Sequence, residues 1–207
     1  MKALISLTAF PNLSHYSIYS NFNEVEIEAQ GTYQKQTFRN RYDIFGPNGK
    51  LPLTIPVIYS SKNKQLYRDV KISNVEKWQS QHLKSLMTAY NSSPFFEYYI
   101  DDLMPLFNTT YNFLFEYNLI CNETLNACVQ IDKDLELTTQ FKNQNGATFD
   151  FRNLAKLKTV IPYNFKSYTQ MFCVKHGFLP NLSILDLLFN EGPNTLNYLE
   201  QQTIKTE

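Results

Sequence analysis

Residues 2–8 (KALISLT) and residues 25–29 (VEIEA) are the two stretches that decide the fold. The first is an apolar run of the length of a short buried strand, and Phe10-Pro11 breaks it. The second alternates apolar and acidic residues, which is the pattern of a half-buried strand. Between them, Asn12 or Ser14 could cap a helix. A strand, a helix and a second strand in this order predict a parallel pair joined by a right-handed crossover.

A turn and a group of helices follow this opening. Gly46-Pro47-Asn48-Gly49 is a strong turn signal, which predicts a hairpin whose second strand lies within residues 51–59. Aromatic and aliphatic residues at helical spacing predict three helices between residues 73 and 119. We therefore predict an α/β fold with a mostly parallel sheet opened by β-α-β, a β-hairpin extension and aromatic-rich helices packed on it. A single domain over residues 1–207 is the simplest organisation.

Composition limits the classes of partner. The 207 residues are 43% hydrophobic and 15% aromatic, which favours a folded chain with a substantial core. The formal net charge is zero, so no overall field attracts nucleic acid or anionic lipid. We expect neither a signal peptide nor a membrane span, because the apolar runs are too short. Three cysteines without CxxC spacing indicate no disulfide framework or metal site, and we expect a cytoplasmic protein.

The segment 33–41 (YQKQTFRNR) is the main candidate for ligand binding. It contains two of the four arginines in the chain, Arg39 and Arg41, and Lys35 lies close by. In a strand these three side chains and Tyr33 would share one face. Arginine binds phosphate through a bidentate fork and lysine acts as a point charge, so the segment predicts an anion site. The alternative is an edge strand whose charges deter aggregation.

Two histidines are candidates for catalysis. His15 falls at the start of the predicted first helix, where free N–H groups and partial positive charge suit a phosphate. His82 lies one helical turn after Trp78, so it could act as an acid or base beside an aromatic ring that stacks on a sugar or a nucleobase. For both histidines the alternative is a packed structural role.

Two polar pairs complete the candidate residues. Asp150-x-Arg152 and Tyr168-x-Gln170 each place two polar groups on one side of an extended segment. Arg152 is therefore expected in a pocket or in a buried ion pair. Asp186 follows Ser183 in an apolar helix and is expected to cap that helix. The sequence contains no GxxxxGK, GxGxxG or GxSxG motif and no His/Cys cluster at metal spacing, so it indicates no metal and identifies no cofactor.

Several of these motifs occur in an order that resembles the WbqC-like family. The resemblance covers nearly the whole chain and is carried by FP at 10–11, HY at 15–16, YQKQ at 33–36, RNR at 39–41, PNG at 47–49, LTIPV at 53–57, Trp78, HL at 82–83, Tyr90, SPFF at 93–96, Tyr168, Gln170, Phe172 and LSILDLLFNEG at 182–192. Relatives carry a glutamine after the first strand and aspartates in the second. This chain has Ser6-Leu7-Thr8 and Glu26-Ile27-Glu28 there, which puts in doubt any metal or general-base role for those positions.

The resemblance implies a context more than a chemistry. The family is bacterial and is associated with O-antigen and other surface-polysaccharide gene clusters, and its biochemistry is largely unassigned. It implies a transferase acting on a nucleotide-sugar or another phosphate-bearing donor, with His15 and His82 as candidate catalytic residues. The alternative is a non-catalytic binding or assembly factor for a glycan precursor or a protein partner. The expected ligand-binding residues are Tyr33, Lys35, Arg39, Asn40, Arg41, Trp78, Arg152, Tyr168 and Gln170.

Overall fold

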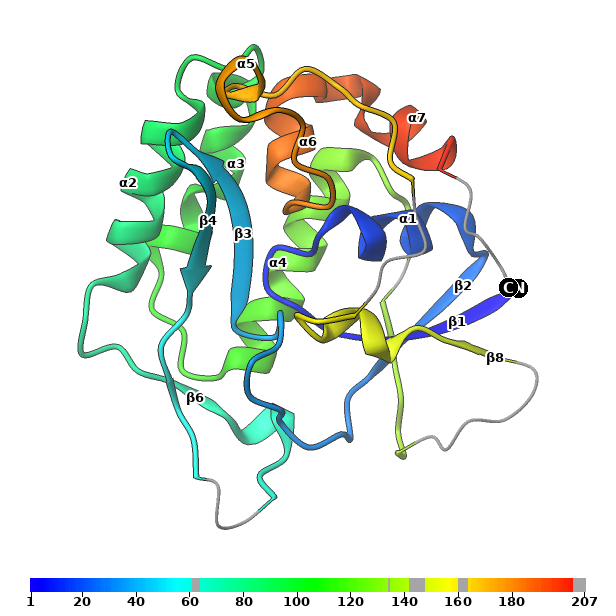
Figure 1. The fold of residues 1–207 in the computed structure, drawn as a ribbon. Coiled ribbons are helices and arrows are strands. Elements are labelled where there is room, and N and C mark those ends of the chain that lie inside the picture. Colours follow the sequence, from blue (N-terminus) through cyan, green and yellow to red (C-terminus); the bar gives the residue numbers. More distant parts are fainter. Residues whose placement is uncertain (61–63, 134, 142–147, 160–163, 203–207) are drawn as a thin grey trace.

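The computed structural model describes residues 1–60, 64–133, 135–141, 148–159 and 164–202 (Figure 1). Its central feature is a parallel sheet in the order β7-β2-β1-β8. The strands are β1 (Lys2–Ser6), β2 (Glu24–Glu28), β7 (Glu136–Leu137) and β8 (Thr148–Asp150). Helix α1 (Leu13–Asn21) connects β1 to β2. The predicted β-α-β opening and the α/β class are therefore confirmed.

The two faces of this sheet differ in chemistry. Ala3 and Ile5 of β1 belong to the hydrophobic core, and so do Val25 and Ile27, their partners on β2. The other face is polar, and the ammonium group of Lys2 lies 3.0 Å from the Glu26 carboxylate there. One face of the sheet thus anchors the strands in the core, and the other carries charged side chains.

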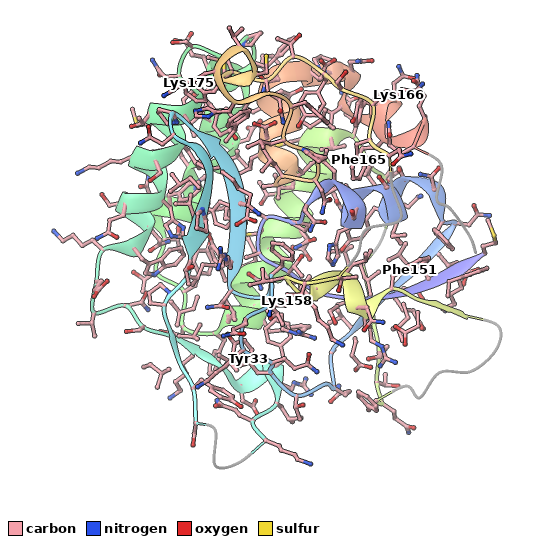
Figure 2. All side chains as sticks on the ribbon, viewed as in Figure 1. Tyr33, Phe151, Lys158, Phe165, Lys166 and Lys175 are labelled. Carbon is pink, nitrogen blue, oxygen red and sulfur yellow. The ribbon has the colours of Figure 1, made fainter. Side chains whose placement is uncertain are left out.

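A hairpin and three long helices form the other side of the molecule. β3 (Arg41–Gly46) and β4 (Gly49–Thr54) pair as a two-stranded antiparallel sheet. The hydroxyl of Tyr90 accepts a hydrogen bond from the Phe45 N–H and donates one to the Asp186 carboxylate. Helices α2 and α3 pack together, and α2 also contacts β3 (Figure 1). Side chains fill the space between the hairpin and the helices (Figure 2). These helices are α2 (Trp78–Tyr90), α3 (Phe96–Asn108) and α4 (Leu114–Val129).

The remaining elements are short. A second antiparallel pair joins β5 to β6. Helices α6 and α7 lie above α1 in Figure 1, and α7 packs against α1. The bounds are β5 (Val57–Ile58), β6 (Lys71–Ile72), α5 (Cys173–His176), α6 (Ile184–Glu191), α7 (Thr195–Glu200), and the 3-10 helices η1 (Tyr67–Asp69), η2 (Arg152–Ala155) and η3 (Gly192–Asn194).

The prediction of a regular strand across residues 33–41 is wrong. Most of this segment is irregular, and only Arg41 belongs to a strand, as the first residue of β3. Gln36 has a φ of 55°, in the left-handed region that an extended strand does not use. The hydroxyl of Thr37 donates to the Gln34 carbonyl oxygen, which closes a local turn. The side chains consequently do not alternate between two faces.

Gly192 is the glycine on which packing depends most strongly. Its φ is 53°, and a Cβ atom built there would lie 2.5 Å from the ring of Phe95. Gly177 is a matched control because its φ is 71° but its Cβ position is open. We expect Gly177→Ala to destabilise the fold by about 1–3 kcal/mol through backbone strain alone. Gly192→Ala should lower the free energy of unfolding further, because the Phe95 ring must also move. Urea unfolding would measure both, and equal losses would contradict the packing argument.

Candidate functional site

A cavity of about 260 Å³ lies where three strands of the parallel sheet end. Ser6 closes β1, Glu28 closes β2 and Asp150 closes β8, and all three border this cavity. The chain leaves β1 toward β2 on one side and later returns as β8 on the other side. In open parallel sheets, ligands bind beyond the carboxyl ends of the strands where the order reverses in this way. We call this space the carboxyl-end cavity.

Arg39 brings a buried positive charge to the carboxyl-end cavity. Its side chain is only 8% exposed, and its Nη2 donates a hydrogen bond of 2.9 Å to the Ser6 hydroxyl. Its Nε and Nη1 have no hydrogen-bond partner, and no ion pair of Arg39 occurs within the described part of the chain. Burial lowers the pKa of Arg39 from its ordinary value, although an arginine stays protonated in proteins. The charge of the Glu28 carboxylate raises the pKa of Arg39 and so balances this guanidinium in part. A buried charge with two unsatisfied nitrogens is nevertheless unfavourable, so this site favours an anionic ligand.

Arg152 also borders the cavity, but two carboxylates hold it. Its Nε and Nη2 donate to the two carboxylate oxygens of Asp150 at 2.9 and 2.6 Å. Its Nη1 lies 3.2 Å from the Glu28 carboxylate, and hydrogen bonding to Asp150 raises the pKa of Arg152. Arg152, Asp150 and Glu28, which we call the Arg152 cluster, link the ends of β2 and β8 and form part of the cavity lining.

The other candidate residues of the segment 33–41 do not border this cavity. Lys35 is exposed, with its ammonium 5.1 Å from the centre of the Tyr59 ring. Arg41 lies 3.5 Å from the Asp43 carboxylate, and the Asn40 amide donates to the Ile55 carbonyl oxygen. Tyr33 is buried and packs against Tyr59. Arg39 is the candidate residue of this segment that borders the cavity, and Gln34, which was not a candidate, borders it as well.

The start of α1 has no free donors for a phosphate. The first three N–H groups of the helix donate to the Leu182 carbonyl oxygen, the Asn181 amide oxygen and the Asn12 amide oxygen. His15 is 1% exposed, and burial, followed by the charge of Arg39, lowers its pKa to about 3. Asn12 therefore caps the helix as predicted, while the expected phosphate contact at this helix start is not available.

His82 and Trp78 lie in the core between α2 and the hairpin, and neither borders the carboxyl-end cavity. The Nδ1 of His82 lies 3.1 Å from the Tyr42 hydroxyl, and its Nε2 lies 3.3 Å from the Thr54 carbonyl oxygen. Burial lowers the pKa of His82 to about 4. These contacts support the structural role that the sequence left open for this pair.

Tyr168 and Gln170 act together, but around Asp186. Tyr168 and Gln170 donate to one carboxylate oxygen of Asp186 at 2.6 and 2.8 Å, and Tyr90 donates to the other at 2.8 Å. Burial raises the pKa of Asp186. The prediction that Asp186 caps its helix is wrong, because Ser183 caps α6 and Asp186 accepts these side-chain hydrogen bonds. This group joins the loop before α5 to α6 and α2.

Sequence reasoning missed several residues that form the cavity. Ser6 and Glu28 were recognised as strand residues, but their roles depend on the register that places them opposite each other. Gln34, Asn153 and Lys156 also border the cavity. Lys156 carried no signal in the sequence, since it lies in a stretch without clear periodicity. No group of three or more His, Cys, Asp or Glu residues that could bind a metal occurs among the residues described.

Comparison with known proteins identifies the family. A model of the WbqC-like protein family matches residues 8–160 and 149–198. The chain belongs to the WbqC-like protein family. It is similar to an uncharacterized protein of Mycobacterium tuberculosis, Rv1507c, with 23% identity over 228 residues that cover 95% of this chain and 96% of that protein. No solved structure matches the chain.

One further property of this WbqC-like protein concerns membranes. Across the described ranges, none of the helices combines the length and the apolar character needed to cross a bilayer.

The hydrogen bond from Tyr168 to Asp186 can be tested for its contribution to stability. Tyr168→Phe removes one donor to a buried carboxyl group, so we expect a loss of about 1–3 kcal/mol in the free energy of unfolding. Tyr98→Phe is the control, since Tyr98 is 73% exposed and its hydroxyl has no such bond. Chemical denaturation would measure both. Similar values for the two variants would show that the hydrogen bond from Tyr168 to Asp186 does not stabilise the fold.

The lowered pKa of His82 predicts an acid-sensitive fold. An unfolded histidine binds a proton below about pH 6.5, whereas folded His82 resists protonation down to about pH 4. Stability is therefore full above pH 6.5 and is lost as the pH falls toward 4. Between pH 7 and pH 5 we expect His82 to account for about 2 kcal/mol of this loss. Urea unfolding of wild type and His82→Gln at both pH values would test this, and an unchanged pH dependence in the variant would refute it.

Proposed function

We propose that the carboxyl-end cavity binds a phosphate-bearing small molecule such as a nucleotide-sugar. We propose further that the protein is a transferase acting on this donor in the biosynthesis of a surface polysaccharide such as O-antigen. The buried guanidinium of Arg39, two of whose nitrogens have no hydrogen-bond partner in the described structure, is the observation that carries this proposal. Its position beyond the carboxyl ends of parallel strands supports it, because this is where such folds bind ligands.

The charge of the cavity favours an anion of this kind. The Arg152 cluster contains one cation and two carboxylates, so it does not itself attract a phosphate. Arg39 and Lys156 add two positive charges, and the lining then carries three cations and two carboxylates, a net charge of plus one. Phosphate oxygens would lie on the side of Arg39 and Lys156. Sugar hydroxyls would find acceptors and donors in Thr32 and Asn153.

The proposed reaction is a simple displacement. A hydroxyl or amine of the acceptor would attack the sugar carbon that carries the diphosphate. The bond from this carbon to the phosphate oxygen would break, the nucleoside diphosphate would leave with the electron pair, and the acceptor would lose one proton to solvent. Such a step requires above all that the negative charge of the leaving group be stabilised, and Arg39 and Lys156 would do this.

A non-catalytic role is the second candidate. Both histidines expected to act in catalysis are buried and lie outside the lining of the carboxyl-end cavity, and burial keeps them neutral near pH 7. A protein that binds a glycan precursor, or assists assembly with a protein partner, needs the anion site but no acid or base. Release of UDP from UDP-glucose in the presence of sugar acceptors, followed by phosphorus NMR, would support the transferase. Binding without release would support the second candidate.

Arg39→Met separates ligand binding from stability. We expect this variant to bind UDP-glucose about 10- to 100-fold more weakly, which corresponds to the loss of a charged hydrogen-bonding group. Its folding stability should not fall, because a buried and incompletely hydrogen-bonded charge is replaced by an apolar side chain. Isothermal titration and thermal unfolding would measure the two effects.

Arg68→Met is the matched control for this experiment. Arg68 is exposed, donates to the Gln30 side chain and does not border the carboxyl-end cavity. Its removal should leave the affinity for UDP-glucose unchanged. Equal affinities of Arg39→Met and wild type would refute the proposed anion site, and a strong loss of stability in Arg39→Met would show that this arginine is structural.

A further inference from the structure

Helices α2 and α3 pack against each other and leave a groove between them at the surface. Both helices lie far from β8 (Figure 1), and no residue that borders the groove borders the carboxyl-end cavity. The groove has a volume of about 380 Å³. Leu83 and Met87 of α2 line it, and so do Phe96, Ile100 and Met104 of α3. We call this surface the α2–α3 groove.

The apolar residues of the groove form one ridge on each helix. Met87 follows Leu83 by four residues on α2, and Phe96, Ile100 and Met104 are also four residues apart on α3. Residues at this spacing lie above one another on a helix. The α3 ridge is about 12 Å long, because a helix rises about 1.5 Å per residue. Two such ridges with a furrow between them match the apolar stripe of a further helix about two to three turns long.

The walls of the groove are open and adaptable. Met87 is 47% exposed, and Ile100 and Met104 are half-buried. Met87 and Met104 are two of the four methionines in the chain. Methionine is unbranched and polarisable, so it adjusts to the shape of a partner and is common at binding surfaces. The groove therefore offers apolar contact to an occupant that covers it.

Carboxylates lie along one rim of the groove. Glu97 and Asp101 border it one turn apart on α3, and no lysine or arginine does. Helix α3 carries a third carboxylate, Asp102, and no cation. Neither Glu97 nor Asp101 forms an ion pair with any residue that the structure describes. The lining thus has a net charge of minus two, in a chain whose formal net charge is zero.

This charge decides between the kinds of occupant. A fatty acid or an anionic membrane surface would supply apolar chains, but the rim would repel its negative charge. A helix with an apolar stripe flanked by lysine or arginine suits both the walls and the rim. A second copy of this chain does not supply such a helix, because no α-helix in the described ranges contains more than one lysine or arginine.

We propose that the α2–α3 groove is a docking site for a basic amphipathic helix of a partner protein. The apolar stripe of that helix lies between the two ridges, and its basic residues face Glu97 and Asp101. This inference does not depend on the proposed function, since the groove is separate from the carboxyl-end cavity.

Two synthetic peptides test the charge and the place of binding. Both carry leucine at positions i, i+3, i+4 and i+7 over about four turns, and the other positions are lysine in one peptide and glutamate in the other. By fluorescence anisotropy, the lysine peptide should bind at least about tenfold more tightly than the glutamate peptide. In amide NMR spectra it should shift the resonances of Met87 and Ile100. Absence of binding, equal affinities, or binding that leaves these two resonances unshifted would overturn the inference.

The acidic rim is tested by Glu97→Gln combined with Asp101→Asn. Binding of the lysine peptide should weaken by about fivefold or more, because two exposed ion pairs are lost. Glu116→Gln combined with Glu123→Gln is the matched control and should leave the affinity unchanged. Both glutamates are exposed, neither borders the groove, and Glu116 lies in the first turn of α4 as Glu97 does in α3. An equal loss in the control would show that overall charge explains the binding, which would sink the docking site.

The apolar wall is tested by Met87→Gln, which keeps the length of an exposed side chain but adds a polar group. Its affinity for the lysine peptide should fall about threefold or more. Val75→Gln is the control, since Val75 is exposed outside the groove. Unchanged affinity in Met87→Gln would count against the groove. Vesicles of phosphatidylcholine with phosphatidylglycerol should leave Met87 and Ile100 unshifted, and shifts there would assign the groove to a membrane surface instead.

Discussion

The register of the parallel sheet is the constraint on which the candidate site depends. Ser6 lies opposite Glu28, and Leu4 lies opposite both Glu26 and Asp150. Successive residues of a strand point to opposite faces, so a shift of one residue would move the polar side chains into the core. The apolar residues of β1 and β2 forbid this shift. Burial of the apolar face therefore fixes the polar side chains at the carboxyl ends of the strands, on the opposite face of the sheet, where the cavity forms.

The rigidity of the surroundings explains how Arg39 keeps its position. The Asn118 side chain of α4 donates to the Arg39 carbonyl oxygen at 2.6 Å, and the guanidinium lies 5.5 Å from the centre of the Tyr67 ring. The Ser6 hydroxyl fixes one end of the side chain. The backbone and the guanidinium are thus held by separate groups, so little ordering remains for a ligand to impose.

The parts of the fold set by local pattern were predictable, and the parts set by distant contacts were not. The alternation in residues 25–29 and the turn at residues 46–49 reflect local preferences, and both elements are present. The segment 33–41 also alternates in its charged residues, but its conformation is decided by pairing with residues near 66 and 156. The sequence of this nine-residue segment does not indicate these distant pairing partners.

The candidate site was predictable to a similar extent. Arg39 and Arg152 were chosen for their chemistry, and both border the cavity. His82 carried the same kind of signal, but its neighbours Tyr42 and Thr54 come from the hairpin and make it part of the core. The partner of Arg152 on β2 lies 124 residues away in the chain. Single-sequence reasoning identifies reactive groups well, but it does not show which of them meet.

The position of Trp78 has a practical consequence. It is the single tryptophan of the chain, it is 3% exposed, and its ring contacts His82 and Tyr117 in the core. Tryptophan fluorescence, excited where the tyrosines do not absorb, therefore comes from one indole enclosed between α2, α4 and the hairpin, and it reports on the integrity of that interior. Because this indole does not border the carboxyl-end cavity, its emission is a convenient optical signal for unfolding and a poor one for occupancy of that cavity by small molecules.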